Sequence, residues 1–187
     1  MLNSFFDKFI FTSTLKYTHH NFYLVNIPFL IAPIDSLSSI AAVQDVEFQK
    51  KIYISIKNGT MDKLVNEFGS NFGLEKGKEL HLIEDFFTAS GWGKLESIDL
   101  QMEGKKAIIV LENSPFVSAL RGKTTLPVDT FLRGMLAGLF SKIFLEDVDC
   151  VEVECAALSG DKCKFIIKQK TEFDFSNIVV QQQLSHE

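Results

Sequence analysis

Cysteine is scarce in this chain, with three copies among 187 residues. An odd and low number does not build the disulfide framework on which small secreted domains depend. The N-terminus also lacks a basic segment followed by an apolar stretch and a small-residue cleavage site, which together mark a secretory signal peptide. We therefore expect a soluble, cytoplasmic protein.

Long apolar runs are missing too. A helix that spans a bilayer needs about 20 consecutive apolar residues. The longest candidate, Phe22 to Ala32, is interrupted by Asn26 and Pro28. The sequence therefore predicts no membrane span.

Positive charge is in deficit, because the formal net charge is -5 and the sequence pI is about 5.4. A protein that binds nucleic acid through bulk electrostatics needs a basic face. The densest groups of lysine, Lys50-Lys51 and residues 162–170, are typical of solvated strands or loops. We expect no nucleic-acid partner.

Phenylalanine, by contrast, is abundant, with 18 copies, and hydrophobic residues make up 46% of the chain. This fraction is ordinary for a globular protein and excludes a disordered one. So much phenylalanine is typical either of a thick aromatic core or of an apolar ligand cavity, and composition does not separate the two. The length fits one domain with a short arm.

The hydrophobic spacing divides the chain into three parts. An N-terminal arm of residues 1–50 is expected to pack on a main domain of residues 51–170, and a loose tail of residues 171–187 follows. In the arm, we predict a short helix, a hairpin and a second helix that Asp35 or Ser36 caps. These elements cover residues 1–10, 11–34 and 35–43.

In the main domain, helices separated from runs of antiparallel strands predict the α+β class, an antiparallel sheet with helices packed on one face. In chain order we expect a strand at 52–57, helices at 60–72 and 79–89, strands at 94–102 and 107–112, an exposed loop at 117–125, a helix at 127–145, and strands at 149–157 and 161–170. Gly134 and Gly138 lie one turn apart on the last helix, so another backbone can approach closely, and we expect that neighbour to be the sheet.

The last two strands bring two cysteines together. Leu158-Ser159-Gly160 fits a three-residue hairpin loop in which the glycine is left-handed. Cys155 then faces Cys163 across the ladder, with Cβ atoms within about 5.5 Å, on the inward face of the sheet. Regular alternation directs Glu152 and Glu154 to the other face unless a β-bulge turns the strand.

Three interpretations of this pair remain open. Buried free cysteines usually act as small hydrophobic residues. A disulfide is a second interpretation, although a reducing cytoplasm disfavours it. The third is a zinc ion, which needs four ligands in a tetrahedron, and the residues themselves do not identify the other two.

The hairpin also carries a family resemblance. The stretch Val151–Cys155, with Gly160 and Cys163-Lys164-Phe165 after it, resembles the closing signature of 4-vinyl-reductase-like domains. Phe131–Gly138 is similar to the glycine-bearing helix of that family, and weaker similarity extends back to Ile52. Such domains resemble the small subunits of vesicle-tethering trafficking complexes in fold. They also form the sensory module of phenol-responsive transcription activators.

The resemblance implies a structural zinc ion beside a buried pocket for an aromatic effector. The sensors hold this zinc with a cysteine of the helix, a glutamate and two hairpin cysteines, which correspond here to Asp129, Glu152, Cys155 and Cys163. Aspartate also ligates zinc, so a site that includes Asp129 would be harder and more anionic than that of the family. Alternatively, Asp129 is a first-turn acid that pairs with Arg133.

No catalytic signature accompanies these features, and we expect a regulatory or carrier module that binds an apolar or aromatic small molecule, as a homodimer. The ligand pocket is expected between the helices and the sheet, lined by Phe68, Phe72, Phe86, Phe87, Trp92 and Phe131. One alternative is a fully packed scaffold protein like the trafficking-complex subunits. Another, suggested by the family's name, is an accessory factor in tetrapyrrole vinyl reduction.

Overall fold

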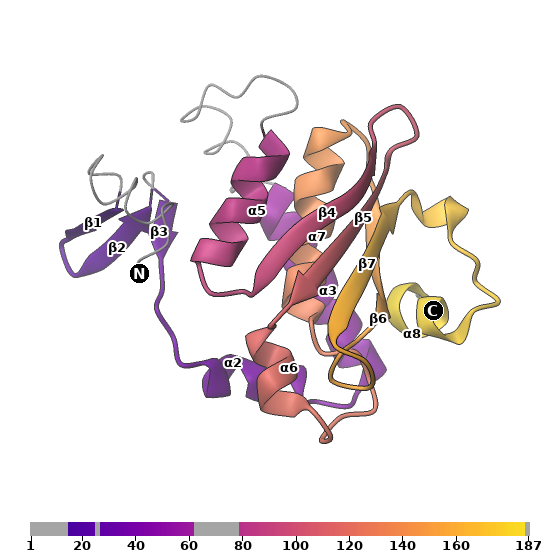
Figure 1. Ribbon diagram of the computed structural model, residues 1–187, viewed down its shortest axis with the longest axis horizontal. Coiled ribbons are helices and arrows are strands. Elements are labelled where there is room, and N and C mark those ends of the chain that lie inside the picture. The colour runs from indigo at the N-terminus through magenta and orange to yellow at the C-terminus, as the bar shows by residue number, and fades with distance from the viewer. Residues whose placement is uncertain (1–14, 25–26, 62–78, 186–187) are drawn as a thin grey trace.

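The core of the protein is a four-stranded antiparallel sheet. The computed structural model describes residues 15–24, 27–61 and 79–185. The strand order is β4-β5-β7-β6, and the elements of the main body are α3 (Val46–Gly59), α5 (Glu79–Ala89), β4 (Lys94–Gln101), β5 (Lys106–Glu112), α6 (Pro115–Leu120), α7 (Thr130–Ile143), β6 (Asp149–Glu154) and β7 (Lys162–Lys168). Helix α5 contacts β4, and α7 contacts both β6 and β7 (Figure 1). The α+β class is confirmed.

The N-terminal arm forms a separate small sheet beside α5. Its strands are β1 (Leu15–Thr18), β2 (Asn21–Leu24) and β3 (Ile27–Phe29), which pair antiparallel in chain order. The expected hairpin is confirmed, and its turn places both His19 and His20 at positive φ, 49° and 66°, as a tight two-residue turn requires. The next helix, α2 (Ile34–Ala41), contacts α6. Its N-cap is Pro33, which makes no side-chain bond, so the cap predicted at Asp35 or Ser36 is wrong.

Helix α3 replaces the strand predicted at residues 52–57, which is therefore wrong. Asp45 caps the helix by accepting a 2.9 Å hydrogen bond from the Phe48 amide. The alternation of isoleucine with polar residues suggested a half-exposed strand, but Tyr53 and Lys57, four residues apart, are both buried. Their polar ends bind Asp149 of β6, with the Tyr53 hydroxyl 2.7 Å and the Lys57 ammonium 2.9 Å from Oδ1.

The small-residue stripe of α7 faces α3, not the sheet as predicted. A Cβ atom added at Gly134 would lie 2.8 Å from Ile56 Cβ and 2.9 Å from the Tyr53 carbonyl oxygen. One added at Gly138 would lie 2.6 Å from the Lys57 carbonyl oxygen. These glycines therefore let two helix backbones touch, and α7 lies between the sheet and α3 (Figure 1).

Two further expectations are corrected. Part of the loop predicted at 117–125 is helix α6, whose Phe116, Val117 and Leu120 are buried. The tail predicted to be loose contains a 3₁₀ turn at Lys170–Glu172 and α8 (Ile178–Leu184), which contacts β6. Val180 and Leu184 anchor α8 by burial in the core.

Some expectations lie outside the described residues, namely the helix at 1–10, most of the helix at 60–72, and the side chains of Phe68 and Phe72. The proposed boundary between residues 50 and 51 falls within α3, and the division into arm, main domain and tail stays a prediction. None of the helices in the described ranges has the length and hydropathy that a bilayer-spanning segment requires.

The contact between α3 and α7 leads to a test. We expect Gly138→Ala to lower the free energy of unfolding by about 1–3 kcal/mol, because the new methyl group meets backbone that cannot move aside. Gly59→Ala is the matched control, since nothing lies within 4 Å of the added atom, and it should be neutral or slightly stabilising. Urea unfolding followed by circular dichroism measures both. Equal effects of the two substitutions would contradict the close packing.

Candidate functional site

A single extra residue in β6 shapes the site. Strand β6 pairs with β7 so that Glu152 lies opposite Phe165, but Glu154 lies opposite Lys164, with a register shift between them. Val153 is therefore the additional residue of a β-bulge, which bends a strand and re-aims its side chains. Beyond the bulge the ladder has the register predicted from the three-residue loop, whose Gly160 has a φ of 76°.

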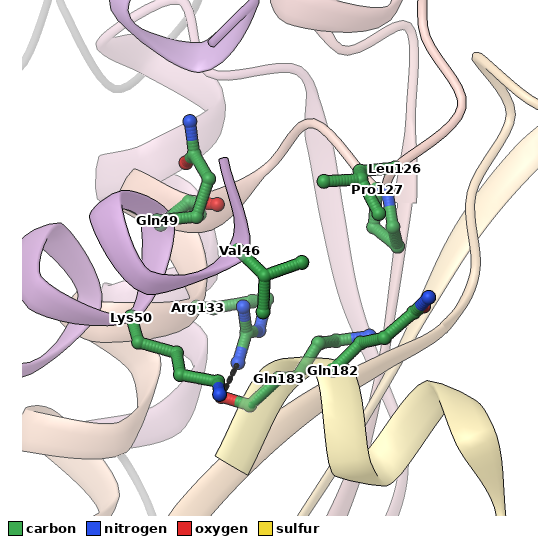
Figure 2. A pocket seen from close by; sticks show the side chains of 9 residues that line it. Val46, Gln49, Lys50, Leu126, Pro127, Arg133, Gln182 and Gln183 are labelled. Atoms are coloured by element: carbon green, nitrogen blue, oxygen red, sulfur yellow. Dashed lines mark hydrogen bonds between the residues drawn. The ribbon is translucent and has the colours of Figure 1, made fainter. Parts of the chain in front are cut away.

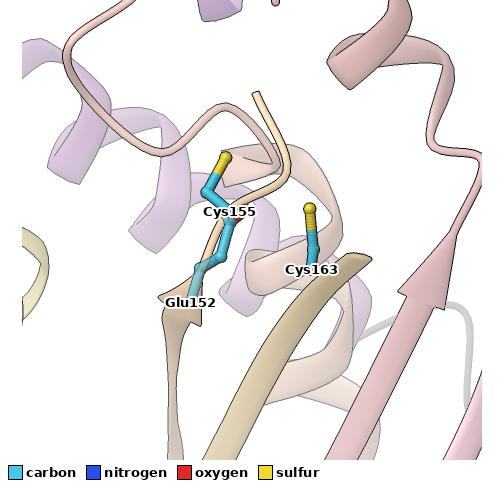
Figure 3. A group of neighbouring side chains, drawn as sticks. All are labelled: Glu152, Cys155 and Cys163. Carbon is cyan, nitrogen blue, oxygen red and sulfur yellow. The ribbon is translucent and has the colours of Figure 1, made fainter. Parts of the chain in front are cut away.

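The bulge directs Glu152 toward the two cysteines. The Glu152 carboxylate and the Cys155 and Cys163 sulfur atoms all lie within 4.8 Å of one another (Figure 3). All three residues are buried, and the Ala156 amide donates a 3.3 Å hydrogen bond to Cys163 Sγ. The predicted meeting of the two thiols on the inward side is confirmed.

Asp129, immediately before α7, lies beside this cluster. Its Oδ1 accepts a 2.7 Å hydrogen bond from the Ser114 hydroxyl, and its amide donates to Glu152 Oε2 at 3.2 Å. The alternative pairing with Arg133 is not formed. That guanidinium instead donates to the carbonyls of Cys150 and Gln183 and lies 4.6 Å from the centre of the Tyr53 ring.

The cluster is rich in acidic groups and poor in cations. Burial raises the pKa of Asp129 to about 6, against the lowering effect of Ser114 and Cys163 beside it. Burial, and next the charge of Asp129, raise the pKa of Glu152 well above its usual range. The thiol of Cys163 hydrogen-bonds to Cys155, so the pKa of Cys155 falls to about 5 while that of Cys163 rises.

Two buried carboxyl oxygens in this cluster, Asp129 Oδ2 and Glu152 Oε1, have no hydrogen-bond partner among the described residues. Unpaired buried oxygens cost free energy, and a divalent cation would satisfy them. The donor set of two sulfur atoms and carboxylate oxygen fits zinc. Cys150, the third free cysteine, lies outside this group.

Sequence reasoning missed Gln183, which holds Glu152 in place from α8. The Gln183 side chain accepts a 2.9 Å bond from the Glu152 amide and donates a 2.9 Å bond to the Glu152 carbonyl. It thereby pairs with the free edge of β6 as a neighbouring strand would. Next to it lies a polar cavity of about 20 Å³, with Lys50 and Arg133 in its wall (Figure 2). No sequence pattern marks a single glutamine for this task.

A larger, apolar pocket of about 410 Å³ lies between the arm and the main body. Trp92 forms part of its wall and stacks on Phe116 at 5.8 Å between ring centres, and Phe116 stacks on Phe131 at 5.7 Å. Of the aromatic residues expected to bind a ligand, Trp92 thus lines this pocket, while Phe86 and Phe87 are buried in the core. The residues that line it are Phe22, Phe29, Leu30, Ile31, Ala32, Ile34, Leu37, Ser90, Gly91, Trp92, Pro115 and Phe116.

A third cavity, polar and about 110 Å³ in volume, reaches the cysteine cluster. Cys163 and Ser114 belong to its wall, and its other lining residues are Leu111, Asn113, Val117, Ser118, Arg121, Ala156 and Asp161. Since Ser114 also binds Asp129, the cavity touches both sides of the cluster.

Comparisons with known proteins agree with this geometry. Residues 107–169 match the family model of the vinyl-4-reductase domain, so the resemblance to vinyl-reductase-like domains is confirmed over this segment. An uncharacterised protein of Methanocaldococcus jannaschii, MJ1460, is 27% identical over 134 residues, which cover 68% of this chain and 78% of the relative.

Two solved structures share the fold. The phenol-responsive sensory domain of the transcription activator PoxR, solved with phenol, has a TM-score of 0.72 at 12% identity and 94% coverage of each chain. A trafficking protein particle complex subunit 3 from Naegleria fowleri, covalently bound to palmitic acid, has a TM-score of 0.50 at 16% identity, covering 72% of this chain and 88% of that one. At these identities the likeness establishes the fold alone.

The bond between Gln183 and β6 is directly testable. Gln183→Ala leaves the amide and carbonyl of Glu152 without partners, so we expect the free energy of unfolding to fall by about 1–3 kcal/mol. Gln182→Ala is the matched control, because the described structure records no hydrogen bond from that side chain, and it should change stability by less than about 0.5 kcal/mol. Denaturant midpoints measure the difference, and equal midpoints would show that α8 does not support the strand.

Proposed function

We propose that this chain, with its vinyl-4-reductase domain, is a regulatory or carrier module that binds an apolar or aromatic small molecule and holds a structural zinc ion. The observation that carries the proposal is the apolar pocket of about 410 Å³. This volume lies in the range of ligand sites, which are mostly apolar with few polar groups. Among its described lining residues there is no charged side chain, so a neutral ligand is favoured.

The relatives support the same proposal. The PoxR domain, which has this fold over 94% of each chain, was solved with phenol. The trafficking subunit was solved with covalently bound palmitic acid. A flat aromatic ring or an acyl chain therefore suits the exposed wall of Trp92 and Phe116, and a pocket of this size argues against the fully packed scaffold alternative.

The zinc proposal is supported by Glu152, Cys155 and Cys163, whose ligand atoms converge, and by the unpaired buried oxygens. A bound ion would neutralise the buried acidic groups and join β6 to β7 near the start of α7. Because zinc binds only the folded arrangement, it adds to stability. Three free cysteines without a disulfide also suit the reducing cytoplasm that we expect from the sequence.

The homodimer stays a prediction. Leu30 and Ile31 of the arm are 85% and 75% exposed, and exposed apolar groups favour association. Light scattering at several protein concentrations would detect a dimer, and a constant monomer mass would contradict it.

Ligand binding can be followed with Trp92, the single tryptophan of the chain, which lines the pocket. We expect phenol or palmitic acid to change its fluorescence saturably. Ala32→Phe should weaken binding at least about tenfold, or about 1.4 kcal/mol, because the added ring occupies the pocket. Ile178→Phe, on the exposed surface of α8, is the matched control and should bind normally.

A tetrapyrrole tested in the same titration separates the accessory-factor alternative. If only the tetrapyrrole binds, that alternative replaces our proposal. If no compound changes the fluorescence of the wild-type protein, the ligand-binding function is refuted.

The metal is tested by elemental analysis of the purified protein. We expect about one zinc ion per chain in the wild type and none in Cys155→Ser. Cys150→Ser is the matched control, because that buried cysteine lies outside the cluster, and it should retain the ion. Removal of zinc by a chelator should lower the melting temperature of the wild type only where metal is present. A metal-free wild type, or equal loss in both variants, would rule out this site.

A further inference from the structure

The candidate metal centre has three converging protein ligands, and the fourth acidic group stands apart from them. The ligand atoms of Glu152, Cys155 and Cys163 lie within 4.8 Å of one another, and Asp129 is not part of that group. Zinc held by four protein ligands is closed, whereas zinc held by three keeps a position for an outside molecule. The geometry thus differs from a closed four-ligand site.

Asp129 is fixed by bonds that do not involve the metal. Ser114 holds its Oδ1 at 2.7 Å, and its amide is engaged by Glu152. Its Oδ2 is buried and has no hydrogen-bond partner among the described residues. Asp129 therefore presents a free acceptor next to the cluster, where it can bind an N–H group.

The polar cavity of about 110 Å³ connects the cluster with the surface. Cys163 and Ser114 line it and are themselves buried. Ser118, Arg121 and Asp161 also line it and are exposed. A small molecule has both a route and a space here, since the volume is several times what one water molecule needs.

Resting on the metal site proposed above, we propose that the ion keeps one open coordination position, which a small external ligand reaches through this cavity. Two thiolates and one carboxylate already exceed the charge of a divalent cation, and Asp129 adds a further acidic group. Another anion is therefore disfavoured. The ligand class that fits is a small neutral nitrogen base that also carries an N–H group for Asp129, such as an azole.

Cobalt(II) makes the open position visible, because its absorption spectrum depends on the ligands around it. We load the full-length protein with cobalt in place of zinc and titrate it with imidazole, 1-methylimidazole and azide. Imidazole should shift the cobalt bands saturably. We expect 1-methylimidazole, which lacks the N–H group, and azide, which is anionic, to bind at least about tenfold more weakly.

Three variants assign the effect to the position. Asp129→Cys supplies a fourth thiolate, so cobalt should stay bound while the response to imidazole disappears. Asp129→Asn should remove the preference for imidazole over 1-methylimidazole. Asp161→Asn, at the exposed end of the cavity, is the matched control and should respond as the wild type does.

The outcomes separate this inference from the metal site itself. Cobalt that binds stoichiometrically but ignores imidazole overturns the open position and leaves the structural ion intact. The same holds if Asp129→Cys responds like the wild type. A wild-type protein that binds neither zinc nor cobalt overturns the metal site and the open position together.

Discussion

The candidate metal centre depends on the conformation of one residue, Glu152, at the bulge of β6. Three groups hold it there: the Gln183 side chain bonds to both its amide and its carbonyl, and the Asp129 amide binds its carboxylate. Without the extra residue Val153, regular alternation would point this carboxylate away from the cysteines. A buried carboxylate is costly unless it is well bonded, so the bulge, α8 and the start of α7 form one interdependent unit.

A second buried polar group, Asp149, fastens the outer layer to this unit. It receives the Tyr53 hydroxyl and the Lys57 ammonium from α3, and the Tyr53 hydroxyl in turn accepts a 3.0 Å bond from the Cys150 amide. Because Gly134 and Gly138 let α3 touch α7, these long polar side chains can reach β6. The polar bonds therefore fix the position of α3, while the close backbone contact makes the distance short enough.

The sequence predicted the features that local rules determine. The hairpin loop with Gly160, the two facing cysteines, helix α5 and the α+β class all follow from turn residues and hydrophobic spacing. It misread α3 as a strand, because Tyr53 and Lys57 look solvent-exposed until Asp149 is known to meet them 92 or more residues later. The bulge at Val153 and the role of Gln183 were out of reach for the same reason, since both are set by tertiary contacts. The burial of α6 was missed because its short apolar segment lacks a full helical period.

Helix α6 connects the two proposed sites. Its N-cap, Ser114, holds Asp129 beside the metal cluster, and the next two residues, Pro115 and Phe116, line the apolar pocket. The helix is a single short rigid element, with Phe116 stacked between Trp92 and Phe131. A displacement of Phe116 by a ligand would therefore move Ser114 as well, and with it the carboxylate that borders the metal. Two sites that share one element in this way are linked energetically, so whatever changes the affinity of one must change that of the other by the same factor.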